Sequence, residues 1–411
     1  MSTQSLLSAF TAALLCAAVP ALGQQKLVNL PDGPGKEQVQ SLCSGCHGLN
    51  RVMNSGYPQA YWNTAIRMML NFGVPIPPDQ INLVTDYLAK HRPEKPKPDA
   101  NIINGPVKVA IREWQVPIPG SRPHDPLATR DGAIWYTGQM SNRLGRVDTK
   151  TGQVREYPLK SPLTAPHGLV EDKDGNIWFT GNQIAIVGKL DPRTGNVTEY
   201  KMPDPKARDP HSLAFAPDGM LFFTLQQSNM IGRLDSKSGE ITLVTSPTPR
   251  SRPYGIMVNS KGVPHVVLFG TNKIARIDPK TMEIREYPLP DPRARPRRMA
   301  YGPSDVIYYA DYPRGMLGRL DPESGNVTEW QSPGGPKSEP YGIVYTKGAV
   351  WYSESGTRPN TIVRFDPKSE QFQTWAIPSG GYIVRKMDVT PDGNPVTATS
   401  TINGVGLVEV K

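Results

Sequence analysis

The architecture follows from residues 131–137, Asp-Gly-Ala-Ile-Trp-Tyr-Thr, and from two short segments that come after them. The Asp-Gly pair is typical of a tight turn, and the aromatic run behind it is typical of a β-strand. Residues 144–148, Leu-Gly-Arg-Val-Asp, predict a further strand, and the acidic-aromatic pair Glu156-Tyr157 marks the outer strand of the unit. Short strands joined by tight turns indicate one antiparallel sheet.

The acidic-aromatic pair recurs along the chain with a nearly constant spacing. Copies begin at residues 113, 156, 199, 286 and 329, and weaker copies at 241 and 374 fill the series. A period of about 43 residues with several strands in each unit is the pattern of β-propeller blades. The sequence therefore predicts an all-β propeller of seven blades over residues 109–411.

Each unit begins with a strand that carries Pro-His-Gly, as at 166–168, or a variant such as Pro-Tyr-Gly at 253–255. The last unit lacks an outer strand of its own. We expect residues 109–117, which precede the first full unit, to complete it, because closing the ring removes the free sheet edges.

The residue after this proline is expected to face the central channel in every blade. Read around the ring, these residues are His124, His167, His211, Tyr254, Arg297, Tyr341 and Arg385. Three histidines on adjacent blades can bind a divalent metal or an anionic ligand. The alternative is a polar ring that is simply solvated at the channel mouth. His265 stands where other blades carry Trp and is expected to be a packing variant.

With its Trp-Phe/Tyr-Thr and Leu-Gly-Arg segments in most units, this region resembles the streptogramin (virginiamycin B) lyase family of seven-bladed propellers. The resemblance implies elimination chemistry on a cyclic lactone, with a divalent metal, a histidine and glutamates at the channel end. The family often places Glu after the aromatic run. The matching residues here are Gly138, Gly181, Leu225, Leu268, Asp311 and Glu354. Only Asp311 and Glu354 are acidic, and with the three histidines they complete the candidate catalytic set.

A second motif, Cys43-Ser44-Gly45-Cys46-His47, lies near the N-terminus. Two thiols at this spacing can each bond one vinyl group of a haem, and the following histidine is then placed as an axial iron ligand. A thioredoxin-like redox pair would need a surrounding βαβ pattern, and a zinc site would need a second pair of soft ligands. The only other cysteine is Cys16, so the motif predicts covalent haem c.

Helices are expected on both sides of this motif, over residues 35–46 and 78–90. The sixth iron ligand is expected to be a thioether or a second imidazole. Candidates are Met53, Met68, Met69 and His91. Met53 follows too closely on the motif to reach the other haem face, and His91 lies past the helix end, where it is expected to act as a cap.

This segment resembles the small class I cytochromes c through the attachment motif, residues 62–73 and the terminal Tyr-Leu-Ala at 87–89. The resemblance implies Met69 as the ligand, four residues before Gly73, with Met68 as the alternative. His/Met ligation leaves no open iron position and favours electron transfer. A segment of this size has little core of its own, so we expect an all-α domain over 30–93 that needs haem to fold.

Residues 1–23 predict an export signal, with a small-residue cleavage site before Gln24, although no Lys or Arg precedes the apolar run. An uncleaved anchor is the alternative. Covalent haem attachment also fits an exported, periplasmic protein that is not integral to the membrane after cleavage. Residues 94–108 are rich in Pro and Lys and predict a semi-rigid, extended linker.

The 411 residues carry a net charge of +9, and the basic residues are spread along the chain. Nucleic-acid binding would need a concentrated basic stripe, so acidic partners or anionic substrates are expected instead. The leading hypothesis is an exported, monomeric electron carrier whose propeller docks a redox partner protein or a small substrate. The alternatives are a propeller enzyme, acting as a metal-dependent lyase or as a dehydrogenase that reduces the haem, and a purely structural binding module.

Overall fold

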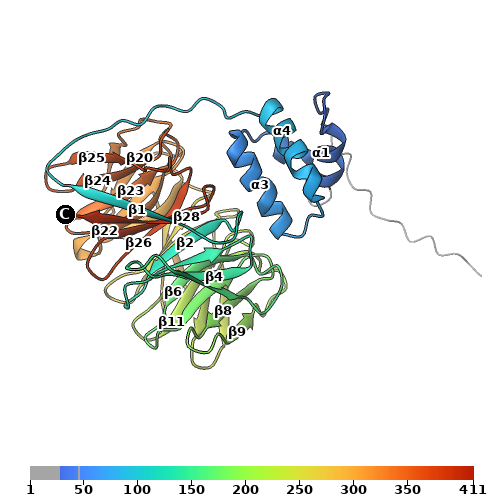
Figure 1. Cartoon of the computed structure of the whole chain (residues 1–411). Coiled ribbons are helices and arrows are strands. Elements are labelled where there is room, and N and C mark those ends of the chain that lie inside the picture. The colour runs from blue at the N-terminus through green and yellow to red at the C-terminus, as the bar shows by residue number, and fades with distance from the viewer. Residues whose placement is uncertain (1–27, 45–46) are drawn as a thin grey trace, which may run out of the picture.

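The computed structural model describes residues 28–44 and 47–411. These residues form an N-terminal helical region and seven four-stranded sheets arranged as a propeller, with the helices beside it (Figure 1). In the described part of the chain, no helix has the length and apolar character needed to cross a membrane. The predicted signal, residues 1–23, lies outside the described residues.

Six blades follow the order of the chain, from the innermost strand to the outermost. The first three blades comprise β2 (Pro123–Ala128), β3 (Ile134–Gly138), β4 (Arg143–Val147), β5 (Val154–Pro158), β6 (Pro166–Glu171), β7 (Ile177–Gly181), β8 (Ile186–Leu190), β9 (Val197–Lys201), β10 (Pro210–Phe215), β11 (Met220–Leu225), β12 (Met230–Asp235) and β13 (Ile241–Thr245). The next three comprise β14 (Pro253–Val258), β15 (Pro264–Leu268), β16 (Lys273–Ile277), β17 (Ile284–Pro288), β18 (Pro296–Tyr301), β19 (Ile307–Asp311), β20 (Met316–Leu320), β21 (Val327–Gln331), β22 (Pro340–Thr346), β23 (Ala349–Glu354), β24 (Thr361–Asp366) and β25 (Gln371–Ala376). A short 3₁₀ turn, η2 (Pro303–Asp305), joins β18 to β19.

The seventh blade joins the two ends of the propeller. Its inner strands are β26 (Val384–Val389), β27 (Pro395–Thr399) and β28 (Gly404–Val410), and its outer strand is β1 (Val109–Gln115). The two strands β1 and β28 pair antiparallel along their whole length, from Val109 opposite Val410 to Gln115 opposite Gly404. The predicted closure by the residues ahead of the first full unit is therefore confirmed.

The Leu-Gly-Arg segments have a packing role within the blades. In four blades the glycine of the third strand faces an aromatic ring of the second, and a Cβ there would lie 2.0–2.1 Å from a ring atom. The pairs are Tyr136 with Gly145, Phe179 with Gly188, Phe223 with Gly232, and Tyr309 with Gly318. Only glycine leaves room for these rings, which explains why the motif recurs.

The helical region contains α1 (Lys36–Cys43), α2 (Leu49–Met53), α3 (Gln59–Asn71), the 3₁₀ turn η1 (Pro78–Gln80) and α4 (Ile81–His91). The helix predicted from residue 35 starts at Lys36. The helix predicted from residue 78 starts as a 3₁₀ turn, in which Gln80 N donates to the carbonyl oxygen of Pro77 at 2.9 Å. The buried core of this region includes Val39, Trp62, Ile66, Val84 and Leu88.

The predicted linker has no helix and is held along the sixth blade. Ile103 N donates to Thr374 Oγ1 at 2.7 Å, and Glu94 forms an ion pair with Arg358 at 2.8 Å. The helices also contact the propeller directly, since the rings of Tyr61 and Tyr382 lie 3.8 Å apart. These contacts fix the helical region against one part of the propeller.

Candidate functional site

A cavity of about 210 Å³ lies beside the helices of the N-terminal region. Cys43 at the end of α1, His47 shortly after it, and Met68 and Met69 of α3 all line this cavity. Its remaining wall in this region is mainly apolar and aromatic, with Leu42, Val52, Tyr57, Tyr61, Trp62, Ala65, Ile66, Val74, Ile76 and Leu88. The structure therefore brings Cys43 and His47 of the Cys-x-x-Cys-His motif together with Met68 and Met69 around one cavity.

Helix α3 is positioned by its buried face. Trp62 and Ile66 lie in the core, and Trp62 Nε1 donates to the carbonyl oxygen of Arg92 at 2.8 Å. This bond ties α3 to the chain just after α4, and the ring of Tyr57 packs edge-on against Trp62 at 5.0 Å. Met68 and Met69 follow on the same helix and are partly buried.

The donor set of the cavity fits haem c. Imidazole and thioether are the axial ligands of electron-transfer cytochromes, and a mainly apolar wall is the surrounding that a porphyrin needs. Burial raises the pKa of the Cys43 thiol, which disfavours the thiolate that disulfide exchange requires. The second cysteine of the motif, Cys46, lies outside the described residues.

The other two candidates for the iron ligand lie elsewhere. Met53 ends α2 and packs against the core of the helical region. His91 is the last residue of α4, and its ring lies 4.5 Å from that of Tyr87. Neither belongs to the described residues that line the cavity.

The propeller contributes a second cluster, the ring of side chains at the start of the innermost strands. Neighbouring rings are in contact around it, with centroid separations of 3.9 Å for His124–His167, 3.8 Å for His167–His211 and 4.0 Å for His211–Tyr254. Tyr254 and Tyr341 share a hydrogen bond of 2.5 Å. The seven predicted ring positions thus face one another across the channel.

A backbone irregularity at the same place in each blade aims these side chains. The register between the first two strands shifts directly after the first residue of the innermost strand in all seven blades. Such a bulge lets one residue turn out of the ladder. In four blades a hydroxyl at the end of the aromatic run also secures the site: Thr180 Oγ1, for example, accepts from Gly168 N and donates to the carbonyl oxygen of His211 in the next blade, both at 2.8 Å.

Guanidinium packing completes the ring. The Arg297 guanidinium lies 3.9 Å from the centroid of Tyr341 and 4.3 Å from that of Tyr312. Each of the three histidines is only 4% exposed. These three side chains are therefore packed against their neighbours and have little contact with solvent.

In three blades the residue after the ring position is charged, and these residues, Asp125, Arg298 and Lys386, form a charged layer that sequence reasoning missed. Asp125 Oδ1 lies 2.8 Å from His124 Nδ1 and 3.4 Å from Arg298 Nη2, and its Oδ2 lies 3.7 Å from Lys386 Nζ. Arg298 also donates to Ser212 Oγ at 2.7 Å. The sequence offered one signal that could have identified these residues: each directly follows a ring residue in the repeat.

Burial keeps the ring histidines neutral. It lowers the pKa of His167 to about 3 and holds the pKa of His124 and of His211 well below the usual range. Burial alone would raise the pKa of Asp125, but Arg298 and other neighbouring cationic groups hold it well below its usual range. The layer therefore combines the Asp125 carboxylate with the basic side chains of Arg298 and Lys386.

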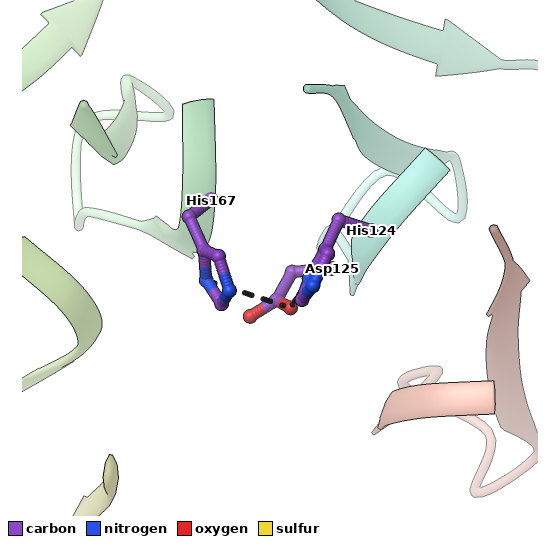
Figure 2. A group of neighbouring side chains, drawn as sticks. All are labelled: His124, Asp125 and His167. Carbon is purple, nitrogen blue, oxygen red and sulfur yellow. Dashed lines mark hydrogen bonds and ion pairs between the residues drawn. The ribbon is translucent and has the colours of Figure 1, made fainter. Parts of the chain in front are cut away.

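His124, Asp125 and His167 offer three ligand atoms within 4.8 Å of one another, the one such group found among the described residues. Figure 2 shows the three side chains converging from two neighbouring blades. Neutral imidazoles and a carboxylate are suitable ligands for a divalent metal. Arg298 and Lys386, however, already neutralise Asp125, and their charges oppose a dication at this place.

The two acidic candidates, Asp311 and Glu354, are bonded to neighbouring groups of the propeller. Asp311 accepts from Arg295 N at 3.0 Å and pairs with Arg314 at 3.1 Å, and burial raises its pKa to about 6. Glu354 accepts hydrogen bonds from Ser332 Oγ, Gly334 N and Thr361 Oγ1, each at 2.6 Å. Neither carboxylate contacts a ring side chain within the described chain, so the expected catalytic set is not assembled.

His265 is 2% exposed and bonds to the hydroxyl of Tyr301 at 2.8 Å. This placement agrees with the packing role expected for it.

Beyond the charged layer, the central channel widens into a cavity of about 380 Å³. Arg298, Lys386 and Asp388 line it together with apolar residues of the innermost strands. The propeller thus holds a mainly apolar space with charged side chains along it.

Comparisons with known proteins concern the propeller. A sequence model of the virginiamycin B lyase family matches residues 100–365. A solved streptogramin B lyase structure is 25% identical with a TM-score of 0.68, and the match covers 74% of this chain and 98% of that one. No curated protein sequence matches the chain significantly.

Virginiamycin B lyase from Staphylococcus aureus is 23% identical with a TM-score of 0.67, covering 74% of this chain and 99% of that one, and its structures include a catalytically inactive variant with quinupristin. Kuenenia stuttgartiensis hydrazine synthase is 15% identical with a TM-score of 0.57, covering 70% of this chain and 96% of that one. Both likenesses show the propeller fold alone.

Proposed function

Because this chain belongs to the virginiamycin B lyase family, and because its helices add a cavity lined by Cys43, His47 and Met69, we propose that it is an exported c-type haem protein that transfers electrons. The observation that supports the proposal most is the meeting of Cys43 and His47 with Met69, which lies more than twenty residues after them in the sequence. Haem bound there supplies one-electron chemistry.

The residues of the chain have distinct parts in this proposal. Cys43 and Cys46 would hold the porphyrin covalently, and His47 and Met69 would bind its iron. The apolar wall excludes water, which would favour the reduced, less charged form of the iron. With both of these side chains on the iron, the site would exchange electrons without binding a substrate at the metal.

The propeller is proposed to hold the partner or small substrate with which electrons are exchanged. The cavity of about 380 Å³ in its channel supports a small substrate, because it combines apolar walls with the charged groups of Arg298 and Lys386. The lyase chemistry of the relatives is not the leading proposal, since Asp311 and Glu354 are held by structural bonds.

The test is the absorption spectrum of the protein purified from a host that attaches haem c during export. We expect a sharp α-band after reduction, and no attached haem when both cysteines of the motif are replaced by Ala. Reduced protein should return to the oxidised form when a soluble one-electron acceptor is added. A correctly folded protein that shows no α-band would overturn the proposal.

The second candidate is an enzyme whose propeller channel performs metal-dependent elimination or substrate oxidation. Only the group of His124, Asp125 and His167 favours it. Metal analysis of the purified protein separates the two functions. A divalent ion that is lost in His124→Gln and His167→Gln would support the enzyme, and an unchanged metal content in these variants would exclude a metal held by this group.

A further inference from the structure

The haem cavity is not formed by the helical region alone. Arg122, Ile383, Arg385 and Thr401 of the propeller line it together with Cys43, His47 and Met69. Arg122 directly precedes β2, and Arg385 is the ring residue of β26. The cavity therefore lies between the helices and the ring end of the propeller channel.

Three guanidinium groups lie at this cavity, those of Arg51, Arg122 and Arg385. No carboxylate lines the cavity, and none of the three arginines forms an ion pair within residues 28–44 and 47–411. Arg385 Nε is buried without a hydrogen-bond partner in the same described part. Burial, together with the charges of Arg385 and Arg51, lowers the pKa of Arg122 to about 10.

Clustered, partly buried cations without a counter-charge are unfavourable, because each loses water and repels the others. An anion at this place removes both penalties. Arginine suits a carboxylate in particular, since its planar fork can donate two parallel hydrogen bonds. Haem carries two propionate carboxylates on one edge, and no other carboxylate is available within the lining of this cavity.

We propose that Arg122 and Arg385 of the propeller bind the haem propionates, so that the propeller is part of the haem pocket. The inference rests on the proposed haem function and goes beyond it, because it assigns the propionate edge to the ring end of the channel. Arg385 belongs to both the haem pocket and the ring that includes His124 and Tyr341. The propeller then sets the reduction potential of the iron as well as holding a partner or substrate.

The test is potentiometric titration of the intact haem-loaded protein, in which one electron from a mediator reduces ferric to ferrous iron. Loss of a cation beside the propionates favours the oxidised form. We expect Arg122→Gln and Arg385→Gln to lower the equilibrium constant for reduction on the order of tenfold each, which is about 59 mV for a one-electron couple. Arg122→Lys and Arg385→Lys keep the charge and should restore most of the potential. Arg193→Gln, an exposed turn position, is the control and should leave it unchanged.

Haem content is measured first for every variant, so two failures remain distinct. Absence of haem from the wild-type protein would overturn the proposed function itself. Unchanged potentials in haem-loaded Arg122→Gln and Arg385→Gln would overturn only the propionate assignment. A wild-type potential that shifts on addition of inorganic phosphate would also overturn it, because the arginines would then hold a free anion. If the glutamine variants do not fold, haem-loaded lysine variants with a potential equal to wild type and a lower denaturant midpoint support the assignment, and lysine variants identical to wild type in both contradict it.

Discussion

Met68 and Met69 are adjacent on α3, and both line the cavity that we propose holds haem. Neighbouring residues of a helix point about 100° apart, so only one of the two thioethers can be directed at the iron. We predict that Met69→Leu abolishes the weak near-infrared absorption of thioether-ligated ferric haem and lowers its potential. Met68→Leu should leave both unchanged, because Leu replaces Met at similar volume. The opposite pattern in the two spectra would reassign the ligand to Met68.

His265 gives the propeller a pH-dependent stability. Burial lowers its pKa to about 4 from an unfolded value near 6.5. The unfolded chain therefore binds the proton more readily, and the stability contributed by the neutral ring is full above about pH 6.5 and is lost as the pH falls towards 4.

Replacing His265 by Phe, as blade three has Phe222 at this position, should remove this dependence. Between pH 8 and pH 5.5 the variant should lose about 1 kcal/mol less stability than the wild type, from the linkage of one such group. Urea unfolding at the two pH values measures the difference. Equal losses in the two proteins would show that His265 does not remain neutral when buried.

Residue by residue, the repeat predicted the ring of His124 and its equivalents because a bulge recurs at one place in every blade. It did not predict Asp125 or Arg298, since this position holds a glycine in three other blades and shows no common chemistry. Arg122 was missed because its importance comes from a helical segment that lies far from it in the sequence.

Within a blade, the second and third strands are matched by an aromatic residue and a glycine. Phe223 covers Gly232, and a Cβ on the glycine would lie 2.1 Å from the ring. Blade four replaces this pair by Val266 and Ala275 at the same register. In blade four the smaller Val on the second strand thus leaves room for Ala in place of Gly on the third strand.

We predict that Gly232→Ala destabilises the propeller by about 1–3 kcal/mol through overpacking. The double variant Phe223→Val with Gly232→Ala, which copies blade four, should be more stable than the sum of the two single changes by about 1 kcal/mol or more. Denaturant unfolding of the four proteins measures this coupling. Additive effects would show that ring and glycine do not compete for the same space.

Strand and turn positions were readable from the sequence because each blade repeats the same local chemistry. The helices were readable in less detail. The predicted helix at residue 78 begins as the 3₁₀ turn Pro78–Gln80, since the backbone hydrogen bonds around its prolines and not the apolar periodicity set its start. The extended linker was predicted from composition, but its attachment to Thr374 and Arg358 depends on contacts across about 270 residues.

At the scale of the whole molecule, β1 closes the propeller by pairing with β28. A chain that starts at residue 118 lacks this strand and exposes the edge of β28, whereas one that starts at residue 105 keeps it. We expect the shorter chain to melt on the order of 10 °C lower, because it loses a whole strand pairing and several kcal/mol. It should also aggregate, since a free sheet edge pairs with other chains. Equal melting temperatures in differential scanning calorimetry would contradict a closing role for β1.

The placement of the helices against the propeller could not be predicted from the sequence. It depends on single contacts, such as Tyr61 on Tyr382 and Asn71 to the carbonyl oxygen of Pro119, which have no periodic signature. Yet this placement puts Arg122 and Arg385 at the cavity proposed for haem. The link between the proposed redox site and the channel is therefore a property of the assembled molecule.

Intact mass spectrometry of the mature, exported protein tests the central claim most directly. We predict the mass of the processed chain plus one haem, with the addition on the peptide that carries Cys43 and Cys46 and no reaction of either thiol with an alkylating agent. A mature chain without the added mass, in which both thiols are alkylated, would contradict covalent haem attachment and the electron-transfer function proposed from it.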